Sequence, residues 1–330
     1  MKVLSSVILG ITFLAAACAT SGASSKIDEL KISKHPFTIN GREGAIYAIP
    51  TGTIQIKHCH FANCLDEDSS YPARLIGIFF SRKPHGERLP IYTYLIDHPE
   101  GRYLVDAGGD PLWNDNDSWQ CDKRSKFASR ILADVQVPQK EDLISQIKSL
   151  GFNPQDIKSV VITHLHFDHT AALKQLNLPT YIGGADLEAA GKIGAVTCKY
   201  LDGVDLIKTE PLLTERPASE KKLGDTLFGR SLSLTSDDSL RVYSTPGHTP
   251  GSLSIKLSTD QGQIWFIGDI TFSDAAILQN SKVAGMHFNI PQIRQIHDKL
   301  RVLLNMEKSI VVPSHDKLIS KKLNSFFEQK

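Results

Sequence analysis

Short hydrophobic runs with the residue types of β-strands recur along most of the chain, separated by polar turns. They lie at residues 45–49, 75–80, 91–96, 102–105, 159–163, 240–244, 252–257, 263–267 and 309–312. Two other segments carry their apolar residues on one helical face, namely Leu143, Ile144, Ile147 and Leu150, and then Ile293, Ile296, Leu300, Leu303 and Leu304. Gly151 with Pro154 ends the first helix, and Pro291 begins the second. Strands interleaved with outer helices predict one layered α/β domain over residues 36–330.

The first residues follow a different pattern. An uncharged apolar run at 3–17 is typical of a signal peptide and is shorter than the roughly 20 residues of a membrane-spanning helix. Cys18 follows directly, and the pattern resembles a bacterial lipoprotein signal. We therefore expect residues 1–17 to be removed, residues 18–35 to form a lipid-anchored tether, and the protein to be an outer-membrane lipoprotein that faces the periplasm. Cleavage by an ordinary signal peptidase would instead leave a soluble periplasmic or secreted protein.

Charge and cysteine content narrow the function further. The chain has 37 Lys and Arg against 36 Asp and Glu, so it lacks the basic surplus of a nucleic-acid-binding protein. Without the signal segment, four cysteines remain in a compartment where disulfides persist: Cys59, Cys64, Cys121 and Cys198. The spacing around His58, Cys59, His60 and Cys64 lacks a second pair at zinc-finger distance, so we expect disulfides or buried thiols.

The most informative motif follows the hydrophobic run at 159–163. Four potential metal ligands lie close together here: His164, His166, Asp168 and His169. In an extended segment the first three point to one side, and the fourth turns away as the chain enters a helix that we expect near Ala171. One segment can therefore serve two metal ions. Imidazole nitrogens and carboxylate oxygens are ligands that suit zinc, and other divalent metals accept them too.

Further donors lie directly after other predicted strands. His248 stands in a tight loop rich in Pro and Gly, and Asp269 and His315 each follow a hydrophobic run. Asp106 follows another run and precedes two glycines. Donors at the ends of several strands can converge on one edge of the sheets, so we expect a metal site built from several loops.

In their order along the chain, these five motifs resemble those of the metallo-β-lactamase superfamily, from about Ile46 to His315. The resemblance implies an αββα sandwich, in which two mixed sheets pack face to face with helices outside and the metals at one rim. It also implies two zinc ions per chain. His164, His166 and His248 would hold the first, Asp168, His169 and His315 the second, with Asp269 as the bridge and Asp106 as a support behind the ligands.

The details of the motifs resemble N-acyl-homoserine lactonases, notably in the segments 90–106 and 185–190. A bridging Asp269 indicates a two-metal hydrolase, since true β-lactamases usually carry Cys or another residue there. The lactonases typically have a Tyr three residues after the bridging Asp, whereas this chain has Phe272. We expect Phe272 and Phe167 to line an apolar substrate pocket. The missing phenol leaves three hydroxyls as candidate hydrogen-bond donors: Tyr94, Tyr243 and Thr271.

The resemblance implies a quorum-quenching hydrolase that opens the lactone ring of a small molecule through a hydroxide bridging two zinc ions. Asp168 or Asp269 would carry the proton to the leaving alkoxide. Two alternatives stay open. One is another two-metal hydrolase of esters, thioesters or phosphoesters, although no extra helical domain after His315 is expected, which counts against a glyoxalase II type. The other is a non-enzymatic zinc-binding envelope protein.

The remaining histidines belong to none of these motifs: His35, His58, His60, His85, His98, His287 and His297. We expect ordinary surface or core positions for them. His287 is the one that could approach the pocket, because it follows the segment of the bridging Asp269.

Overall fold

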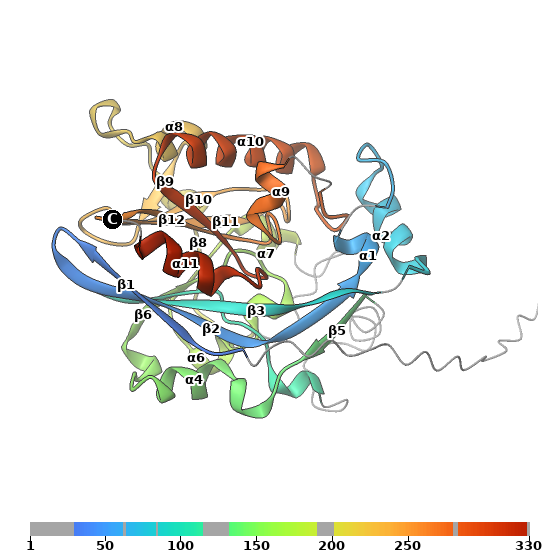
Figure 1. The fold of residues 1–330 in the computed structure, drawn as a ribbon, viewed down its shortest axis with the longest axis horizontal. Coiled ribbons are helices and arrows are strands. Elements are labelled where there is room, and N and C mark those ends of the chain that lie inside the picture. Colours follow the sequence, from blue (N-terminus) through green and yellow to red (C-terminus); the bar gives the residue numbers. More distant parts are fainter. Residues whose placement is uncertain are drawn as a thin grey trace, which may run out of the picture.

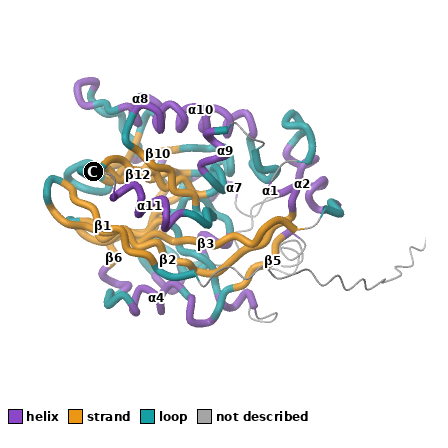
Figure 2. The backbone as a smooth tube through the Cα atoms, viewed as in Figure 1, coloured by secondary structure: helices purple, strands orange, loops and turns teal. Residues whose placement is uncertain are grey.

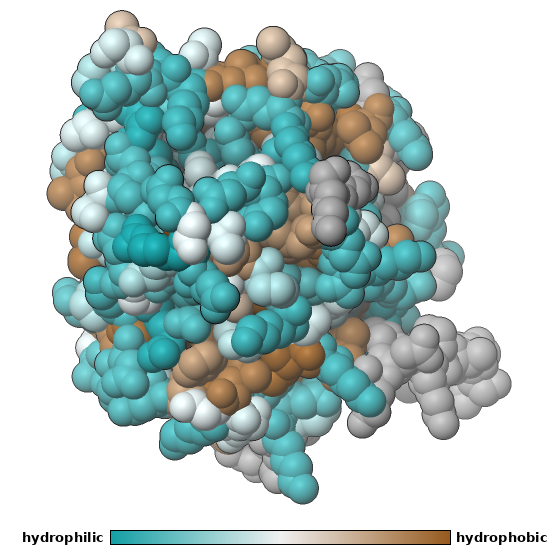
Figure 3. All heavy atoms as spheres, turned by 60° about the vertical axis from the view of Figure 1, so that its left-hand side comes forward, coloured by the Kyte–Doolittle hydropathy of each residue, from teal (hydrophilic) through white to brown (hydrophobic). Residues whose placement is uncertain are grey.

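The structure is a computed structural model that describes residues 30–61, 64–83, 85–114, 132–189, 201–279 and 283–328. The predicted signal peptide, Cys18 and the tether up to residue 29 lie outside the described residues, as do Cys121, Cys198 and Ala190. Within the described ranges, no helix is both long and apolar enough to cross a membrane. The face of the molecule seen in Figure 3 is mostly hydrophilic, with smaller apolar patches between the polar side chains.

The first sheet has the strand order β1-β2-β3-β4-β6-β7-β8, with β5 paired to β2. The strands are β1 (Ser33–Ile39), β2 (Arg42–Lys57), β3 (His85–His98), β4 (Gly101–Val105), β5 (Ala133–Gln136), β6 (Ile157–Val161), β7 (Thr180–Ile182) and β8 (Leu206–Lys208). Strands β1 to β4 pair antiparallel, and the pairs from β4 to β8 are parallel. Strand β1 begins at Ser33, inside the stretch predicted as a tether, because its pairing with β2 extends from Ile39 back to Ser33.

The second sheet has the order β13-β12-β11-β10-β9. Its strands are β9 (Ser231–Ser233), β10 (Leu240–Ser244), β11 (Leu253–Thr259), β12 (Gly262–Gly268) and β13 (Ser309–Pro313). Only the β12 and β13 pair is parallel among its described pairs. One hydrophobic core joins the two sheets, and it contains Ile46 and Tyr94 from the first sheet with Ile255 and Phe266 from the second. The sheets therefore pack face to face.

Helices cover both outer faces, as Figure 1 shows. Helices α4 (Leu143–Ser149) and α6 (Leu173–Leu176) pack on the first sheet, while α8 (Leu223–Phe228), α9 (Asp274–Leu278) and α10 (Ile290–Met306) pack on the second. The other helices are α1 (His58–Phe61), α2 (Tyr71–Phe80), α5 (Phe167–Thr170), α7 (Gly184–Ala189) and α11 (Ile319–Glu328). Short 3-10 turns lie at Pro111–Asn114, Gln139–Glu141, Pro154–Asp156, Glu210–Leu212 and Ala218–Glu220. Figure 2 shows strands between two helical layers, which confirms the predicted αββα sandwich.

The two helices that were predicted from periodicity are present. Helix α4 begins at Asp142, whose carboxylate accepts a hydrogen bond from the Ser145 amide at 2.9 Å, and Gly151 follows its end with φ +82°. Helix α10 begins in the same way at Asn289, whose side chain accepts from the Gln292 amide at 3.1 Å. Gly151 after α4 and Pro291 in the first turn of α10 confirm the predicted end of the first helix and the predicted start of the second.

The predicted strand at 75–80 is wrong, because these residues form the second half of α2. A short apolar run does not distinguish a buried strand from a helix. Here Pro72 lies in the first helical turn, where its missing N–H leaves no hydrogen bond unmade. The run is also only partly buried: Ile76 is 60% exposed and Phe80 73% exposed, while Ile78 is in the core. Helix α2 thus lies on the surface with one face packed inward.

Helix α2 is joined to α1 by a disulfide-closed segment. Cys59 and Cys64 form the disulfide, with their Cα atoms 4.9 Å apart. This pairing is one of those that the sequence left open. The disulfide closes a loop beside the carboxyl end of β2, at the same rim of the sandwich as the loops that follow β6 and β12.

Candidate metal centre

The H-x-H-x-D-H segment leaves β6 and turns into a helix earlier than predicted. The backbone of His166 is extended and forms the N-cap of α5, and the helical turn Phe167–Thr170 follows. The Thr170 hydroxyl donates to the His166 carbonyl at 3.1 Å and holds this turn. Asp168 therefore lies on a helix and not in line with the histidines, which corrects the expected alternation. The turn sends the later pair, Asp168 and His169, to a different side of the rim.

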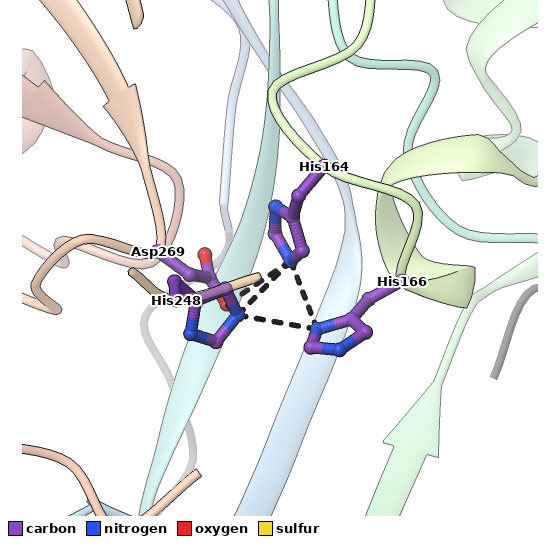
Figure 4. A group of neighbouring side chains, drawn as sticks. All are labelled: His164, His166, His248 and Asp269. Carbon is purple, nitrogen blue, oxygen red and sulfur yellow. Dashed lines mark hydrogen bonds and ion pairs between the residues drawn. The ribbon is translucent and has the colours of Figure 1, made fainter. Parts of the chain in front are cut away.

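Three histidine rings meet at the first position (Figure 4). The Nε2 atom of His164 lies 2.9 Å from Nδ1 of His166 and 3.2 Å from Nε2 of His248, and the latter two nitrogens are also 3.2 Å apart. Tetrahedral coordination with bonds of 2.0 to 2.1 Å would separate ligand atoms by about 3.3 Å. The Oδ2 atom of Asp269 completes the group, 3.9 Å from His164 and 3.7 Å from His248.

A second group forms beside the first from Asp168, His169 and His315. The Asp168 Oδ2 atom lies 3.4 Å from Nε2 of His315 and 3.8 Å from Nε2 of His169. The Asp269 Oδ1 atom faces the same two rings, at 3.3 Å from His315 and 3.5 Å from His169. Asp269 thus directs one oxygen to each group, which is the geometry of a bridging carboxylate.

The donor groups leave polar atoms without partners. Nε2 of His169 and Oδ1 of Asp269 are buried and have no hydrogen-bond partner. A buried polar atom without a partner costs about 1–3 kcal/mol, so such atoms call for a bound group. Lone pairs and carboxylate oxygens converge here from several directions, which fits a divalent cation and not another protein side chain.

Hydrogen bonds on the outer side of the centre orient the histidine rings. Asp106 is fully buried with φ +63°, and its carboxylate accepts from Nδ1 of His169 at 2.8 Å and from the Thr163 amide at 2.7 Å. Nδ1 of His315 donates to the Pro90 carbonyl at 2.7 Å. Because each of these Nδ1 atoms is engaged outward, the Nε2 atoms of both histidines face the centre. Asp106 therefore lies where the sequence placed it, behind the ligands.

Two further side chains support the ligands: His287, which the sequence suggested could approach the pocket, and Asp186, which the sequence did not single out. His287 is buried, and its Nδ1 lies 3.0 Å from Nδ1 of His248, so it orients that ring. Asp186 accepts from the Leu165 and Gly251 amides at 3.2 and 2.6 Å, and from the Thr249 hydroxyl. It thereby ties the loop of the first two histidines to the loop of His248. The small residues 183–184 and Gly251 are the only local signal, because they permit the close approach of these segments.

The two halves of the centre differ in electrostatic character. Burial and the neighbouring imidazoles lower the pKa of His164 and His248 well below the ordinary value. Burial opposes charge on His169 and His315 too, but the surrounding carboxylates prevail and raise the pKa of His169 strongly and that of His315 to about 10. Burial would raise the pKa of Asp269, yet the same two rings hold it well below its ordinary value. The first half thus presents neutral imidazoles, the form that binds metal.

A pocket opens directly onto the donor groups. It exposes His166, Asp168, His248, Asp269 and His315 at its floor. Its walls are apolar apart from one histidine, and they consist of Ile54, Ile56, His60, Leu132, Ala133, Phe167, Phe272 and Met286. Phe167 and Phe272 therefore line the pocket as expected, with the Phe272 ring 5.7 Å from the ring of His315. His60, which we expected to have an ordinary position, is also a wall residue.

Residues 86–315 match the metallo-beta-lactamase superfamily. The chain belongs to this superfamily. The match covers the motifs from β3 to His315, and the clustered His and Asp side chains lie where these loops meet. The protein is accordingly a metal-dependent hydrolase with a divalent metal cofactor.

Within the metallo-β-lactamase superfamily, the chain is 26% identical to the N-acyl homoserine lactonase AttM of Rhizobium radiobacter over 233 residues, or 69% of this chain and 82% of that protein. A solved N-acyl homoserine lactone hydrolase, with N-hexanoyl-L-homoserine at its catalytic metal centre, has a TM-score of 0.62 and 18% identity, covering 89% of this chain and 97% of that one. The dizinc quorum-quenching lactonase AidC has a TM-score of 0.53 and 16% identity, covering 86% and 90%. These structures share the fold of this chain.

Proposed function

We propose that this protein is a dinuclear zinc hydrolase that opens a lactone ring, with N-acyl homoserine lactones as its substrates. The observation that carries this proposal is the position of Asp269, which presents one oxygen to each donor group at the floor of an apolar pocket. The similarity to the lactonase AttM supports the substrate class.

Seven side chains would hold the metals. The first zinc would be held by His164, His166 and His248, the second by Asp168, His169 and His315, and Asp269 would bridge them. Two zinc ions bound there would lower the pKa of a shared water and supply a bridging hydroxide for attack on the lactone carbonyl. Asp106, His287 and the Pro90 carbonyl keep the rings of their partners in place for this task.

Asp168 is the side chain to which we assign proton transfer to the leaving alkoxide. Both oxygens of Asp269 face imidazole rings, whereas only Oδ2 of Asp168 does so among the described ion pairs. Burial would raise the pKa of Asp168, but His169 and His315 lower it. It lines the pocket, within reach of a bound substrate.

The walls of the pocket suit an acyl chain. Ile54, Ile56, Phe167, Phe272 and Met286 offer aliphatic and aromatic surface next to the donor groups. No Lys or Arg occurs among the described residues that line it. A phosphoester would bring charge that these walls do not match, so the pocket favours an apolar carboxylic ester.

The proposal is tested with the zinc-loaded protein and a long-chain N-acyl homoserine lactone in a pH-stat. We expect base uptake that a chelator abolishes and that His164→Ala lacks. A protein that binds two zinc ions but consumes no base with this lactone, while it hydrolyses a thioester or phosphoester, would contradict the proposed substrate class.

We also propose that the protein is exported and anchored by a lipid on Cys18. The apolar run at 3–17 and the disulfide between Cys59 and Cys64 support this, since such disulfides persist in oxidising compartments. Labelled palmitate should be incorporated into the wild-type protein in a bacterial host and not into the Cys18→Ser variant. Equal labelling of both would contradict the anchor.

A further inference from the structure

The pocket has few hydrogen-bond donors outside the metal-binding side chains. Hydrolysis of an ester places negative charge on its carbonyl oxygen, and a preorganised donor at that oxygen speeds the reaction. Phe272 offers no such donor. The three hydroxyls that the sequence suggested are engaged elsewhere. Tyr94 donates to the Pro313 carbonyl at 2.9 Å, Tyr243 to Asp225 at 2.7 Å and Thr271 to the Ser273 carbonyl at 2.9 Å.

His60 is the exception among the described walls of the pocket. Its side chain lines the same pocket as the apolar residues and the donor groups. Its Nδ1 atom is buried and has no hydrogen-bond partner. Leaving such an atom unsatisfied costs about 1–3 kcal/mol, so an imidazole in this state is poised to bond with a ligand.

The backbone that carries His60 is held in place from three sides. The disulfide between Cys59 and Cys64 closes the loop around it. The His60 carbonyl accepts from the Gly285 amide at 3.0 Å. Arg74 of α2 is buried and donates to the carbonyls of Gly285 and His287 at 3.2 and 2.6 Å. Helices α1 and α2 are therefore fastened to the same segment that orients His248, so that the distance from His60 to the centre is set by direct contacts.

We propose that His60 is a catalytic residue of this hydrolase, whose ring N–H donates a hydrogen bond to the carbonyl oxygen of the bound ester. This inference rests on the proposed hydrolase function. The hydrogen bond strengthens as water adds to the carbonyl and the oxygen becomes negative, and it weakens again when the ring oxygen leaves and the carbonyl reforms. His60 keeps its proton throughout, while the proton for the leaving oxygen passes through Asp168.

The electrostatic surroundings agree with this role. Burial, together with His166, lowers the pKa of His60 to about 3. The ring is therefore neutral across the working pH range and carries one N–H. A neutral donor adds no positive charge beside two metal ions, which avoids repulsion in a centre that is already cationic.

The decisive experiment compares two isosteric substitutions. His60→Asn places an amide N–H near the position of Nδ1, and His60→Leu has the same shape without a donor. We expect His60→Leu to lower kcat for the lactone about 10²-fold with KM nearly unchanged, and His60→Asn to retain most of the activity. Zinc content and thermal midpoint should equal those of the wild-type protein in both variants.

A second substitution supplies a new donor from the opposite wall. Phe272→Tyr adds a phenol hydroxyl to the pocket. In the His60→Leu background it should restore kcat about tenfold. A His60→Leu variant with wild-type kcat overturns the proposal, and so does a loss of activity that accompanies a loss of zinc or of thermal stability.

A binding measurement separates this inference from the proposed reaction. The probe is a γ-butyrolactam with the same acylamino group, which has the carbonyl but does not open. We expect it to shift the His60 N–H resonance in the zinc-loaded, ¹⁵N-histidine-labelled protein. If the wild-type protein fails to open lactones but the resonance shifts, the reaction is wrong and the His60 contact stands. An unshifted resonance overturns the contact.

Discussion

Two buried polar clusters in this molecule differ in how the charges of their side chains are balanced. In the cluster around Asp225, on the outer face of the second sheet, the carboxylate accepts from the Tyr243 hydroxyl at 2.7 Å and from the Lys222 amide at 3.0 Å, with Arg216 at 3.8 Å. Lys256 lies 5.5 Å from the centre of the Tyr243 ring. Opposite charges thus meet within the protein, although Nε of Arg216 makes no hydrogen bond.

The metal centre at the rim brings together side chains that can all act as metal ligands. Its imidazole nitrogens and carboxylate oxygens converge, and Oδ1 of Asp269 and Nε2 of His169 make no hydrogen bond, although they lie 3.5 Å apart. Burial is common to both clusters, so burial alone does not identify a functional site. What distinguishes the rim is that imidazole nitrogens and carboxylate oxygens converge there, with no Lys or Arg among the described residues of the pocket, an arrangement that a divalent cation completes.

The largest expected effect follows from the bridge. Asp269→Asn removes the carboxylate charge that faces both donor groups, so we expect bound zinc to fall below two per chain and lactone hydrolysis to fall at least about 10³-fold. Metal analysis and kcat/KM measured on the same preparation check this. Two tightly bound zinc ions with wild-type kcat/KM in the variant would contradict the bridging role.

The Asp225 cluster has a pH signature of its own. Burial, partly offset by Asp225, lowers the pKa of Lys256 from 10.5 to about 8. Between these values the unfolded chain holds a proton that the folded protein releases, so the free energy of unfolding rises with pH across this window. We expect a rise of about 3 kcal/mol from this group. Urea unfolding at a series of pH values should show it in the wild-type protein and not in Lys256→Met.

The same slope is expected with and without a chelator, because no metal takes part in the Asp225 cluster. Parallel pH curves for the wild-type protein and Lys256→Met would show that Lys256 keeps its ordinary pKa in the folded state. That result would contradict the proposed difference between the Asp225 cluster and the metal centre.

A smaller effect is expected from the support behind the ligands. Asp106→Asn keeps a residue that tolerates φ +63° but removes the charge that accepts from Nδ1 of His169. We expect zinc to bind about 10- to 100-fold more weakly. A competition titration with a chromophoric chelator measures this affinity.

Asp225→Asn is the matched control for that titration. It makes the same chemical change in the other cluster, so it should lower the free energy of unfolding by about 1–3 kcal/mol and leave zinc affinity unchanged. Equal losses of zinc affinity in both variants would mean that general destabilisation, and not the support of His169, explains the effect.

Much of the fold was predictable because its signals are local. The strands at 91–96, 240–244 and 263–267 and the helices at α4 and α10 follow from residue type, periodicity and end signals over a few residues. The run at 75–80 was misjudged because a short apolar stretch fits a strand or a helix equally well, and its packing on α1 decides the matter.

The metal centre, too, was predictable from the sequence only in part. The candidate ligands were identifiable because the chemistry of metal binding restricts the residue types and because each ligand follows a strand. The resemblance implied the support by Asp106, but the roles of Asp186 and His287 were not identifiable, since each joins segments far apart along the chain. His287 meets His248 through two loops, and Asp186 meets Thr249 and Gly251 across the first and second sheets. Nothing near His60 in the sequence indicates that Gly285 and Arg74 hold its helix at the pocket.

The sequence by itself thus determined which atoms can bind a metal and which strand ends carry them, because side-chain chemistry and β-strand patterns are encoded within short stretches. The family resemblance also implied that Asp269 faces both donor groups. Only the tertiary structure decided that Phe272 and His60 share one pocket, and that Asp225 has its partners inside the protein. These outcomes depend on how two sheets and their loops pack against one another, and such packing is set by contacts between residues that the chain itself keeps far apart.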